Sequence, residues 1–263
     1  MAIGTWLGAA DTVTRIERLA ATTGKDREAT PLRSAAFPHI AVGKGWSTTF
    51  YITNLDSGRT ANFQLRLVSA GGRELILPVQ LSSGVSGTGS SIYGNLRPAE
   101  TIVIDVTGPA DSDPVYGWAD LSSTSFFYGF SGYAIHRNRL PDQAEQSFTV
   151  ALETKTHSGM MLLLDNRDGY STGAVIANTS SYYTSEIIVR VINPDGTSGP
   201  KQLLTIGPMA IALIPMHEMF PDVKDRLVAI EFEGQDSRAK ITGFGLRLGP
   251  DGQLRHFPSF TTD

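Results

Sequence analysis

Two related stretches decide the fold of this 263-residue chain: GWSTTFYITN at residues 45–54 and GYSTGAVIAN at residues 169–178. At this offset of 124, residues 45–72 align with residues 169–196 without a gap. The identical pairs are Gly45/Gly169, Ser47/Ser171, Thr48/Thr172, Ile52/Ile176, Asn54/Asn178, Ser57/Ser181, Thr60/Thr184, Arg66/Arg190 and Gly72/Gly196. Such self-similarity indicates that one structural unit occurs twice.

The alignment continues beyond this block at a smaller offset. Pro98 matches Pro208 and Ala119 matches Ala229 at an offset of 110 residues, and Gly132 matches Gly243 at an offset of 111. The difference, 124 − 110 = 14 residues, is one insertion in the first copy. It contains the stretch SSGVSGTGSS at residues 82–91, whose composition predicts a flexible loop.

Within each copy, short apolar runs alternate with turn residues. Phe63 to Leu67 alternates apolar and polar side chains with period two, which predicts a half-buried strand. Asn54 and Asn178 end the two related strands, where an Asn side chain can bond to the backbone of the following turn. Further predicted strands are 101–106, 115–121, 132–136, 148–153, 185–192, 211–214, 227–232 and 241–248.

We therefore predict an all-β protein of two tandem immunoglobulin-like antiparallel β-sandwiches with a short N-terminal helical arm. The predicted domains are residues 1–36 (arm and linker), 37–142 (copy one) and 146–258 (copy two). In the arm, Val13, Ile16 and Leu19 recur at helical spacing after Asp11, a candidate N-cap.

Composition excludes several classes of protein. The net charge of −4 argues against a nucleic-acid-binding protein, which would carry a basic face. No apolar run approaches the ~18 residues of a membrane-spanning helix. The absence of cysteine excludes disulfides, thiolate zinc sites and cysteine nucleophiles. Because residues 1–6 contain no basic n-region, the sequence fits either a cytosolic protein or a mature form whose export signal has been removed.

Two segments carry a family resemblance. Phe37-Pro38-His39 followed by residues 45–48 and Asn54, with residues 148–153, 169–172 and Asn178 in the second copy, resembles β-sandwich modules of uncharacterised bacterial secreted and surface proteins. The resemblance covers most of residues 37–258. It implies an extracellular or cell-envelope location and a structural or binding role, with no catalytic residues to transfer.

Motifs for chemistry are weak. The five histidines include no pair at i, i+4, and neither G-x-S-x-G nor a phosphate-binding loop occurs. Acidic loops at residues 165–169 and 111–113 leave a loose calcium site open, although neither fits the EF-hand template. A catalytic carboxylate pair also stays open, because such pairs meet only in the fold. Its candidates are Asp105, Asp120, Glu153, Glu186 and Glu231. We predict no enzyme activity, no cofactor and no metal.

The best binding candidate is the aromatic stretch at residues 116–133. The candidate binding residues are Trp118, Phe126, Phe127, Tyr128 and Phe130, together with Tyr182 and Tyr183 in the second copy. Exposed rings there would suit a glycan or a partner chain, whereas covering by the second module or the arm would make them structural.

The sequence thus predicts a non-enzymatic structural or protein-interaction module of a bacterial cell envelope or extracellular assembly, with a protein partner or self-assembly through its edge strands and arm. The alternative is a carbohydrate-binding module that uses the aromatic residues of 116–133.

Overall fold

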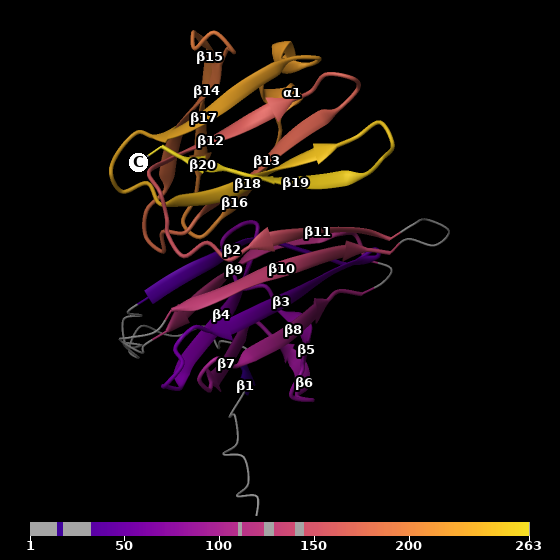
Figure 1. Cartoon of the computed structure of the whole chain (residues 1–263), viewed down its shortest axis with the longest axis vertical. Coiled ribbons are helices and arrows are strands. Elements are labelled where there is room, and N and C mark those ends of the chain that lie inside the picture. The colour runs from indigo at the N-terminus through magenta and orange to yellow at the C-terminus, as the bar shows by residue number, and fades with distance from the viewer. Residues whose placement is uncertain (1–14, 18–32, 110–111, 124–128, 140–144, 263) are drawn as a thin grey trace, which may run out of the picture.

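The computed structural model describes residues 15–17, 33–109, 112–123, 129–139 and 145–262. These residues form an all-β structure of four antiparallel sheets with one short helical segment (Figure 1). The strands of the first half are β1 (Arg15–Glu17), β2 (Arg33–Val42), β3 (Trp46–Asn54), β4 (Ala61–Ser69), β5 (Leu77–Leu81), β6 (Ser86–Gly89), β7 (Ser91–Leu96), β8 (Thr101–Thr107), β9 (Val115–Ser123), β10 (Phe130–Asn138) and β11 (Gln146–Ala151). Those of the second half are β12 (Gly159–Asp165), β13 (Ser171–Asn178), β14 (Ser185–Ile192), β15 (Ser198–Ile206), β16 (Ile211–Pro215), β17 (Leu227–Gly234), β18 (Ile241–Leu248), β19 (Leu254–Pro258) and β20 (Phe260–Thr261). Helix α1 (Met216–Met219) and a 3-10 turn, η1 (Pro221–Val223), connect β16 to β17.

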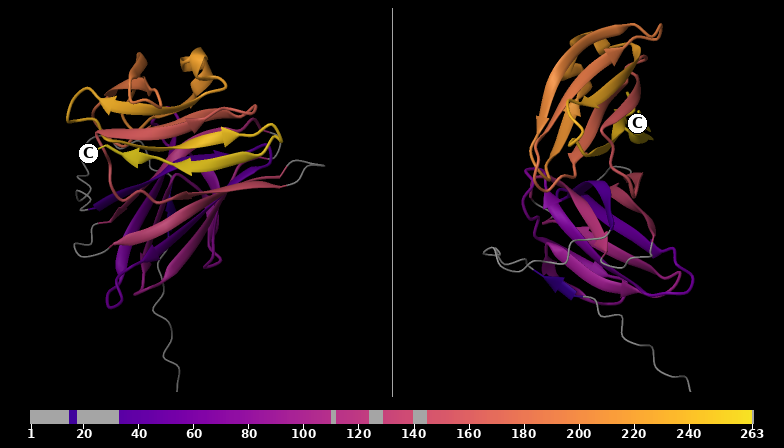
Figure 2. Two further views of the ribbon diagram at one scale, coloured as in Figure 1. Left: turned by 45° about the horizontal axis from the view of Figure 1, so that its top comes forward. Right: turned by 90° about the vertical axis from the view of Figure 1, so that its left-hand side faces the viewer.

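Each half builds one sandwich-like unit around its own core. In unit one, the sheet β1-β7-β4-β9-β2 faces the sheet β11-β10-β3-β8-β5-β6. Alternate residues of both sheets, such as Phe37, Phe50 and Leu65, are fully buried between them. In unit two, the sheet β15-β14-β17-β12-β20 faces the sheet β16-β13-β18-β19 over Ile176, Phe232 and their neighbours. Figure 2 shows the two units stacked end to end.

The strand orders reproduce the sequence repeat. The run β7-β4-β9-β2 of unit one corresponds to β15-β14-β17-β12, and β11-β10-β3-β8 corresponds to β19-β18-β13-β16. Unusual backbone conformations also recur at equivalent positions. Lys44 and Asp168 both adopt a positive φ, as do Ala99 and Met209. Since residues other than glycine rarely adopt this conformation, its recurrence supports a common origin for the two units.

The order of the strands differs from that of an immunoglobulin domain. In an immunoglobulin domain, the first strand of the chain pairs with the second, and the seventh pairs with the sixth. The repeated unit is counted here without β5 and β6, which have no counterpart in unit two. Its first strand, β2, pairs with its sixth, β9, and its seventh strand, β10, pairs with its second, β3. The antiparallel all-β prediction is confirmed, and the finer immunoglobulin-like prediction is not.

The predicted N-terminal helix is wrong where the structure describes the arm. Arg15–Glu17 forms strand β1, which pairs with β7 at the end of unit one that faces away from unit two (Figure 1). Ile16 packs on the core and lies against Gly87 and Gly89. Residues 15–17 therefore form a strand although the spacing of their apolar neighbours is helical, because the burial of Ile16 outweighs local helix propensity. The other residues of the predicted helix lie outside the described residues.

Two other segments differ from their predicted roles. The 14-residue insertion is not a free loop, because β5 and β6 form a hairpin that extends the sheet beyond β8. Residues 146–151, expected at the start of copy two, form β11, which pairs with β10 of unit one. The connection between the units therefore follows Ala151.

The sheet β16-β13-β18-β19 contacts unit one with its outer face. Ala177 and Ile211 pack on Ala36, Val68 and Trp118, which lie on the outer face of the sheet that contains β2, β4 and β9. Gly72 supports this contact. It adopts a positive φ in a turn, and a Cβ at this position would collide with the carbonyl oxygen of Pro208. Its repeat partner Gly196 makes the same turn with nothing nearby.

Candidate functional site

Two of the seven aromatic residues predicted as a binding site are buried in the structure. Trp118 is fully buried and Phe130 is 8% exposed, within the core of unit one. Neither ring is available to a ligand, so the prediction is wrong for both. Phe126, Phe127 and Tyr128 lie outside the described residues.

Trp118 is instead the centre of the first contact between the units. Its indole Nε1 donates a hydrogen bond to the carbonyl oxygen of Met209, at 2.6 Å. Beside it, the backbone N–H of Ile211 donates to the carbonyl oxygen of Ala70, at 3.0 Å. The indole is therefore covered by the second module, which was the structural alternative for this stretch.

A second contact is built from aromatic rings and histidines. The inner face of β11 presents Phe148, which packs with Phe244 of β18 and forms one cluster with Val150 and Val175. His39 lies between the units, with its ring centroid 5.9 Å from that of Phe244 and 4.9 Å from that of His136. Both imidazoles are buried inside this junction.

Burial controls the charge of these histidines. Desolvation lowers the pKa of His39 from 6.5 to about 3. It also lowers the pKa of His136 well below the ordinary value, and repulsion from His39 and His256 adds to the effect. Thr48 Oγ1 donates to the carbonyl oxygen of Ala41 and lies 3.1 Å from Nδ1 of His136. Nδ1 is therefore the donor of that pair, and Nε2 is left as a buried acceptor without a partner among the described residues.

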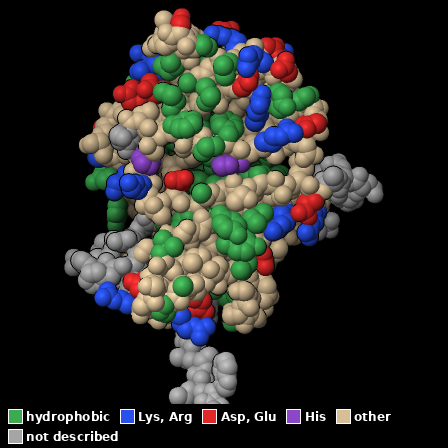
Figure 3. All heavy atoms as spheres, in the orientation of Figure 1, with side chains coloured by type: hydrophobic (Ala, Val, Ile, Leu, Met, Phe, Trp, Pro, Cys, Tyr) green, Lys and Arg blue, Asp and Glu red, His purple; other side chains and the backbone are tan. Residues whose placement is uncertain are grey.

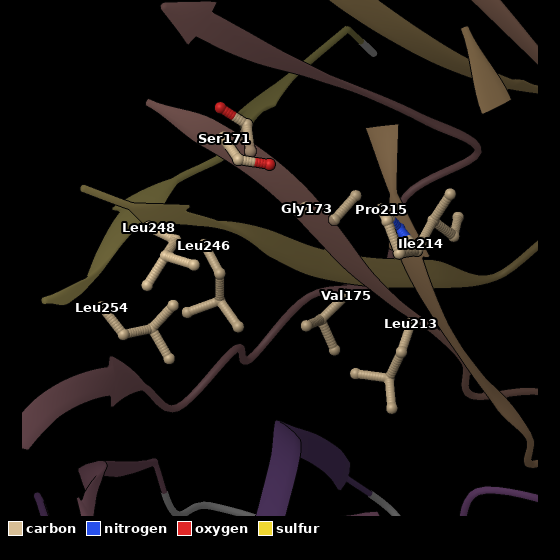
Figure 4. A pocket seen from close by; sticks show the side chains of 11 residues that line it. Ser171, Gly173, Val175, Leu213, Ile214, Pro215, Leu246, Leu248 and Leu254 are labelled. Atoms are coloured by element: carbon tan, nitrogen blue, oxygen red, sulfur yellow. The ribbon is translucent and has the colours of Figure 1, made fainter. Parts of the chain in front are cut away.

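An apolar groove extends from this junction across the outer face of the sheet β16-β13-β18-β19. Its volume is about 240 Å³. Leucines from three strands lie on the same side of the sheet (Figure 4). They are Leu213, Leu246, Leu248 and Leu254. Leu213 and Leu248 are 41% and 45% exposed. We call this surface the leucine groove.

Tyr182 and Tyr183 remain exposed, at 85% and 49%. They lie in the turn that follows Asn178, whose side-chain Nδ2 donates to the carbonyl oxygen of Tyr183 at 2.8 Å. The guanidinium of Arg238 lies 5.3 Å from the centroid of the Tyr183 ring. These two rings belong to unit two, and the structure does not bring them together with Phe130, which is in unit one.

A pair of tyrosines lies on the outer face of β3 and β10: Tyr133, the last residue of the aromatic stretch at 116–133, and Tyr51, which the sequence did not single out. Tyr51 and Tyr133 lie directly opposite each other on the paired strands. Their rings are stacked, with a centroid separation of 4.7 Å and an interplanar angle of 19°. Tyr133 is 41% exposed. Figure 3 shows hydrophobic side chains gathered over these two strands. The period-two pattern of each strand places each ring outward, but only the register reveals that they are neighbours.

Two of the five candidate carboxylates are engaged in structural ion pairs with arginine. Asp120 accepts from Arg66 at 2.6 Å, and Glu231 accepts from Arg190 at 2.7 Å. Arg66 and Arg190 match in the repeat, and each lies directly opposite its carboxylate on the neighbouring strand. The strand register therefore matches Asp120 with Glu231, at an offset of 111, and Ala119 with Ile230 rather than with Ala229.

In the acidic loop at residues 165–169, where the sequence left a loose calcium site open, Asp165 is paired with Arg167. Both carboxylate oxygens of Asp165 accept hydrogen bonds from Arg167, at 2.8 and 2.9 Å. These bonds lower the pKa of the carboxyl group to about 2. Within the described part of the chain, no three His, Asp or Glu side chains are grouped so as to hold a metal ion.

No protein-family model matches the chain, and neither a curated protein nor a solved structure shows significant similarity to it. Among the described residues, no helix is long and apolar enough to span a membrane.

Proposed function

We propose that this chain is a non-enzymatic structural and protein-interaction module of a bacterial cell envelope or extracellular assembly, and that it associates with a second copy of itself through the leucine groove. The observation that carries this proposal is the continuity of the groove with the contact between the units. The face that already buries Phe244 against unit one continues into leucines that are partly exposed.

The size of the groove favours a macromolecular partner over a small molecule. Pockets for small ligands usually have volumes of about 300–1,000 Å³. The leucine groove, at about 240 Å³, is shallower and lined almost entirely by aliphatic side chains. It suits the insertion of one or two apolar side chains of a protein. A second copy supplies them if two grooves face each other across a two-fold axis, which is the commonest symmetry of soluble oligomers.

The distribution of charge supports a structural role. Two arginines that face outward from the strands pair with carboxylates across neighbouring strands, Arg66 with Asp120 and Arg190 with Glu231. The resemblance of residues 37–258 to modules of bacterial surface proteins is the support for the proposed location.

Sedimentation equilibrium tests the proposed association. We expect the wild-type chain to associate reversibly and Leu248→Glu to weaken the association about 100-fold or more. In a two-fold interface the introduced carboxylate is buried once in each copy, and burying an unpaired charge is costly. Each 1.4 kcal/mol lost from the free energy of association raises the dissociation constant tenfold. Leu213→Glu should act in the same direction.

Leu203→Glu is the matched control. Leu203 is a similarly exposed leucine, at 57%, but it lies on β15, in the opposite sheet of unit two. A wild-type chain that stays monomeric at all concentrations, or a Leu203→Glu variant that loses association equally, would contradict the proposal.

A further inference from the structure

The outer face of the sheet β11-β10-β3-β8-β5 carries an apolar band across four neighbouring strands. The stacked pair Tyr51 and Tyr133 forms its centre. Ala151 on β11 and Val103 on β8, the register partners of Tyr133 and Tyr51, continue the band on either side. Four strands at the usual spacing make a band about 14 Å long.

Polar side chains border the band on both sides. One row consists of Thr149, Ile135, Thr49, Asp105 and Gln80, in which Ile135 is the one apolar member, and the other of Ser131, Thr53 and Thr101. We call the band and these two rows the tyrosine face.

Hydrogen bonds hold several of the polar groups in place. Thr49 Oγ1 donates to Asp105 at 2.6 Å and accepts from Arg137 Nη1 at 3.0 Å. The hydroxyls of Thr53 and Thr101 lie 2.8 Å apart. Thr49 is itself buried, at 5% exposure, and it fixes the exposed Asp105 and the partly exposed Arg137. These two groups therefore have defined positions before any ligand arrives, which lowers the entropic cost of binding.

We propose that the tyrosine face binds an oligosaccharide or a polysaccharide chain. The apolar C–H face of each sugar ring would lie on the tyrosine band, and its hydroxyls would bond to Asp105, Arg137 and the exposed threonines Thr101 and Thr149. The arrangement favours a glycan over a protein because the apolar band is narrow and the rows on either side of it are mostly polar. A protein contact usually has a broader apolar centre.

Stacked cross-strand aromatic pairs also stabilise sheets. A purely structural role for the tyrosines is therefore the competing explanation. It is distinguished by measuring binding and stability on the same variants.

The experiment is affinity electrophoresis in gels containing hydroxyethylcellulose, xylan or laminarin, together with a glycan array that includes peptidoglycan fragments. We expect the wild-type chain to bind at least one of these glycans. Tyr51→Ala and Tyr133→Ala should each lower the affinity about tenfold or more, whereas Tyr133→Phe, which keeps the ring, should retain most of it.

Tyr182→Ala is the control, because Tyr182 is more exposed than either tyrosine but lies in unit two. It should leave glycan binding unchanged. The proposal is overturned if the wild type binds none of the glycans, if binding survives both alanine substitutions, or if Tyr182→Ala lowers it equally. Loss of binding accompanied by unfolding in circular dichroism would also count against a ligand role for the rings. Because the leucine groove lies in unit two, Tyr51→Ala should not alter sedimentation, and the two proposals can fail separately.

Discussion

Replacing Asn178 with Ala should lower the free energy of unfolding by about 3–5 kcal/mol. The side chain is fully buried. Its Nδ2 donates to the carbonyl oxygens of Tyr183, Ile206 and Gly207 at 2.8–3.0 Å, and its Oδ1 accepts from the N–H of Ser180 at 3.0 Å. Without the amide, three carbonyls and one N–H each lose a hydrogen bond, although the carbonyl of Gly207 still accepts from the N–H of Ala210 at 3.2 Å. A buried polar group left unpaired costs about 1–3 kcal/mol.

Asn54→Ala should have a similar effect on unit one. Asn54 makes the corresponding four bonds, to the carbonyl oxygens of Arg59, Leu96 and Arg97 and from the N–H of Asp56. Asp should be no substitute at either position, because a carboxylate cannot donate to the three carbonyls. Urea unfolding followed by circular dichroism measures the change.

Asn193→Ala is a matched control for both variants. Asn193 also bonds through its side chain, to Thr197 and Arg226, but these bonds lie at the surface. We expect it to lose about 1 kcal/mol or less. Variants at Asn54 and Asn178 that are no less stable than Asn193→Ala would show that the repeated asparagines do not hold the turns.

Acidification from pH 7 to pH 4.5 should destabilise the wild-type chain by about 2–3 kcal/mol through His39 alone. Burial lowers the pKa of this imidazole to about 3. The unfolded chain takes up its proton near pH 6.5, whereas the folded chain does not at pH 4.5. Stability is therefore complete above pH 6.5 and falls progressively as the pH drops toward 3. His136, whose pKa is lowered in the same direction, should add to the loss.

The variant His39→Phe isolates this effect, since a phenyl ring fills the site without titrating. The groups that face His39 are Tyr116, Phe148, Phe244 and His136. We expect the variant to lose about 2–3 kcal/mol less than the wild type between pH 7 and pH 4.5. Between pH 7 and pH 8 the two proteins should change in parallel, because His39 is neutral in both states there. Parallel curves down to pH 4.5 would show that His39 is not buried in solution.

The sequence was most informative where local chemistry determines structure. The repeat, the antiparallel strands and the role of Asn54 and Asn178 in the following turns could all be predicted, because period-two alternation and turn residues act locally. The equivalent strand orders of the two units agree with the repeat.

The sequence was least informative where structure depends on distant contacts. Ile16 has helical spacing, but the slot beside Gly87 and Gly89 makes its segment a strand. The sequence alone does not distinguish Trp118 from an exposed aromatic residue, because the residues that cover it, Ala177 and Ile211, belong to unit two. Tyr51 becomes part of a candidate site only when the register places it beside Tyr133.

The central claim is that two copies of one sandwich-like unit are docked through a buried contact into a single body. Because the chain contains no cysteine, spin labels can be attached at two introduced cysteines, Gln80→Cys in unit one and Glu186→Cys in unit two, both exposed positions on strands. Double electron–electron resonance at pH 7 should then give one narrow distance distribution, which broadens when Trp118 is replaced by Ala. A broad distribution in the chain that retains Trp118 would show that the units move independently, and would contradict the account.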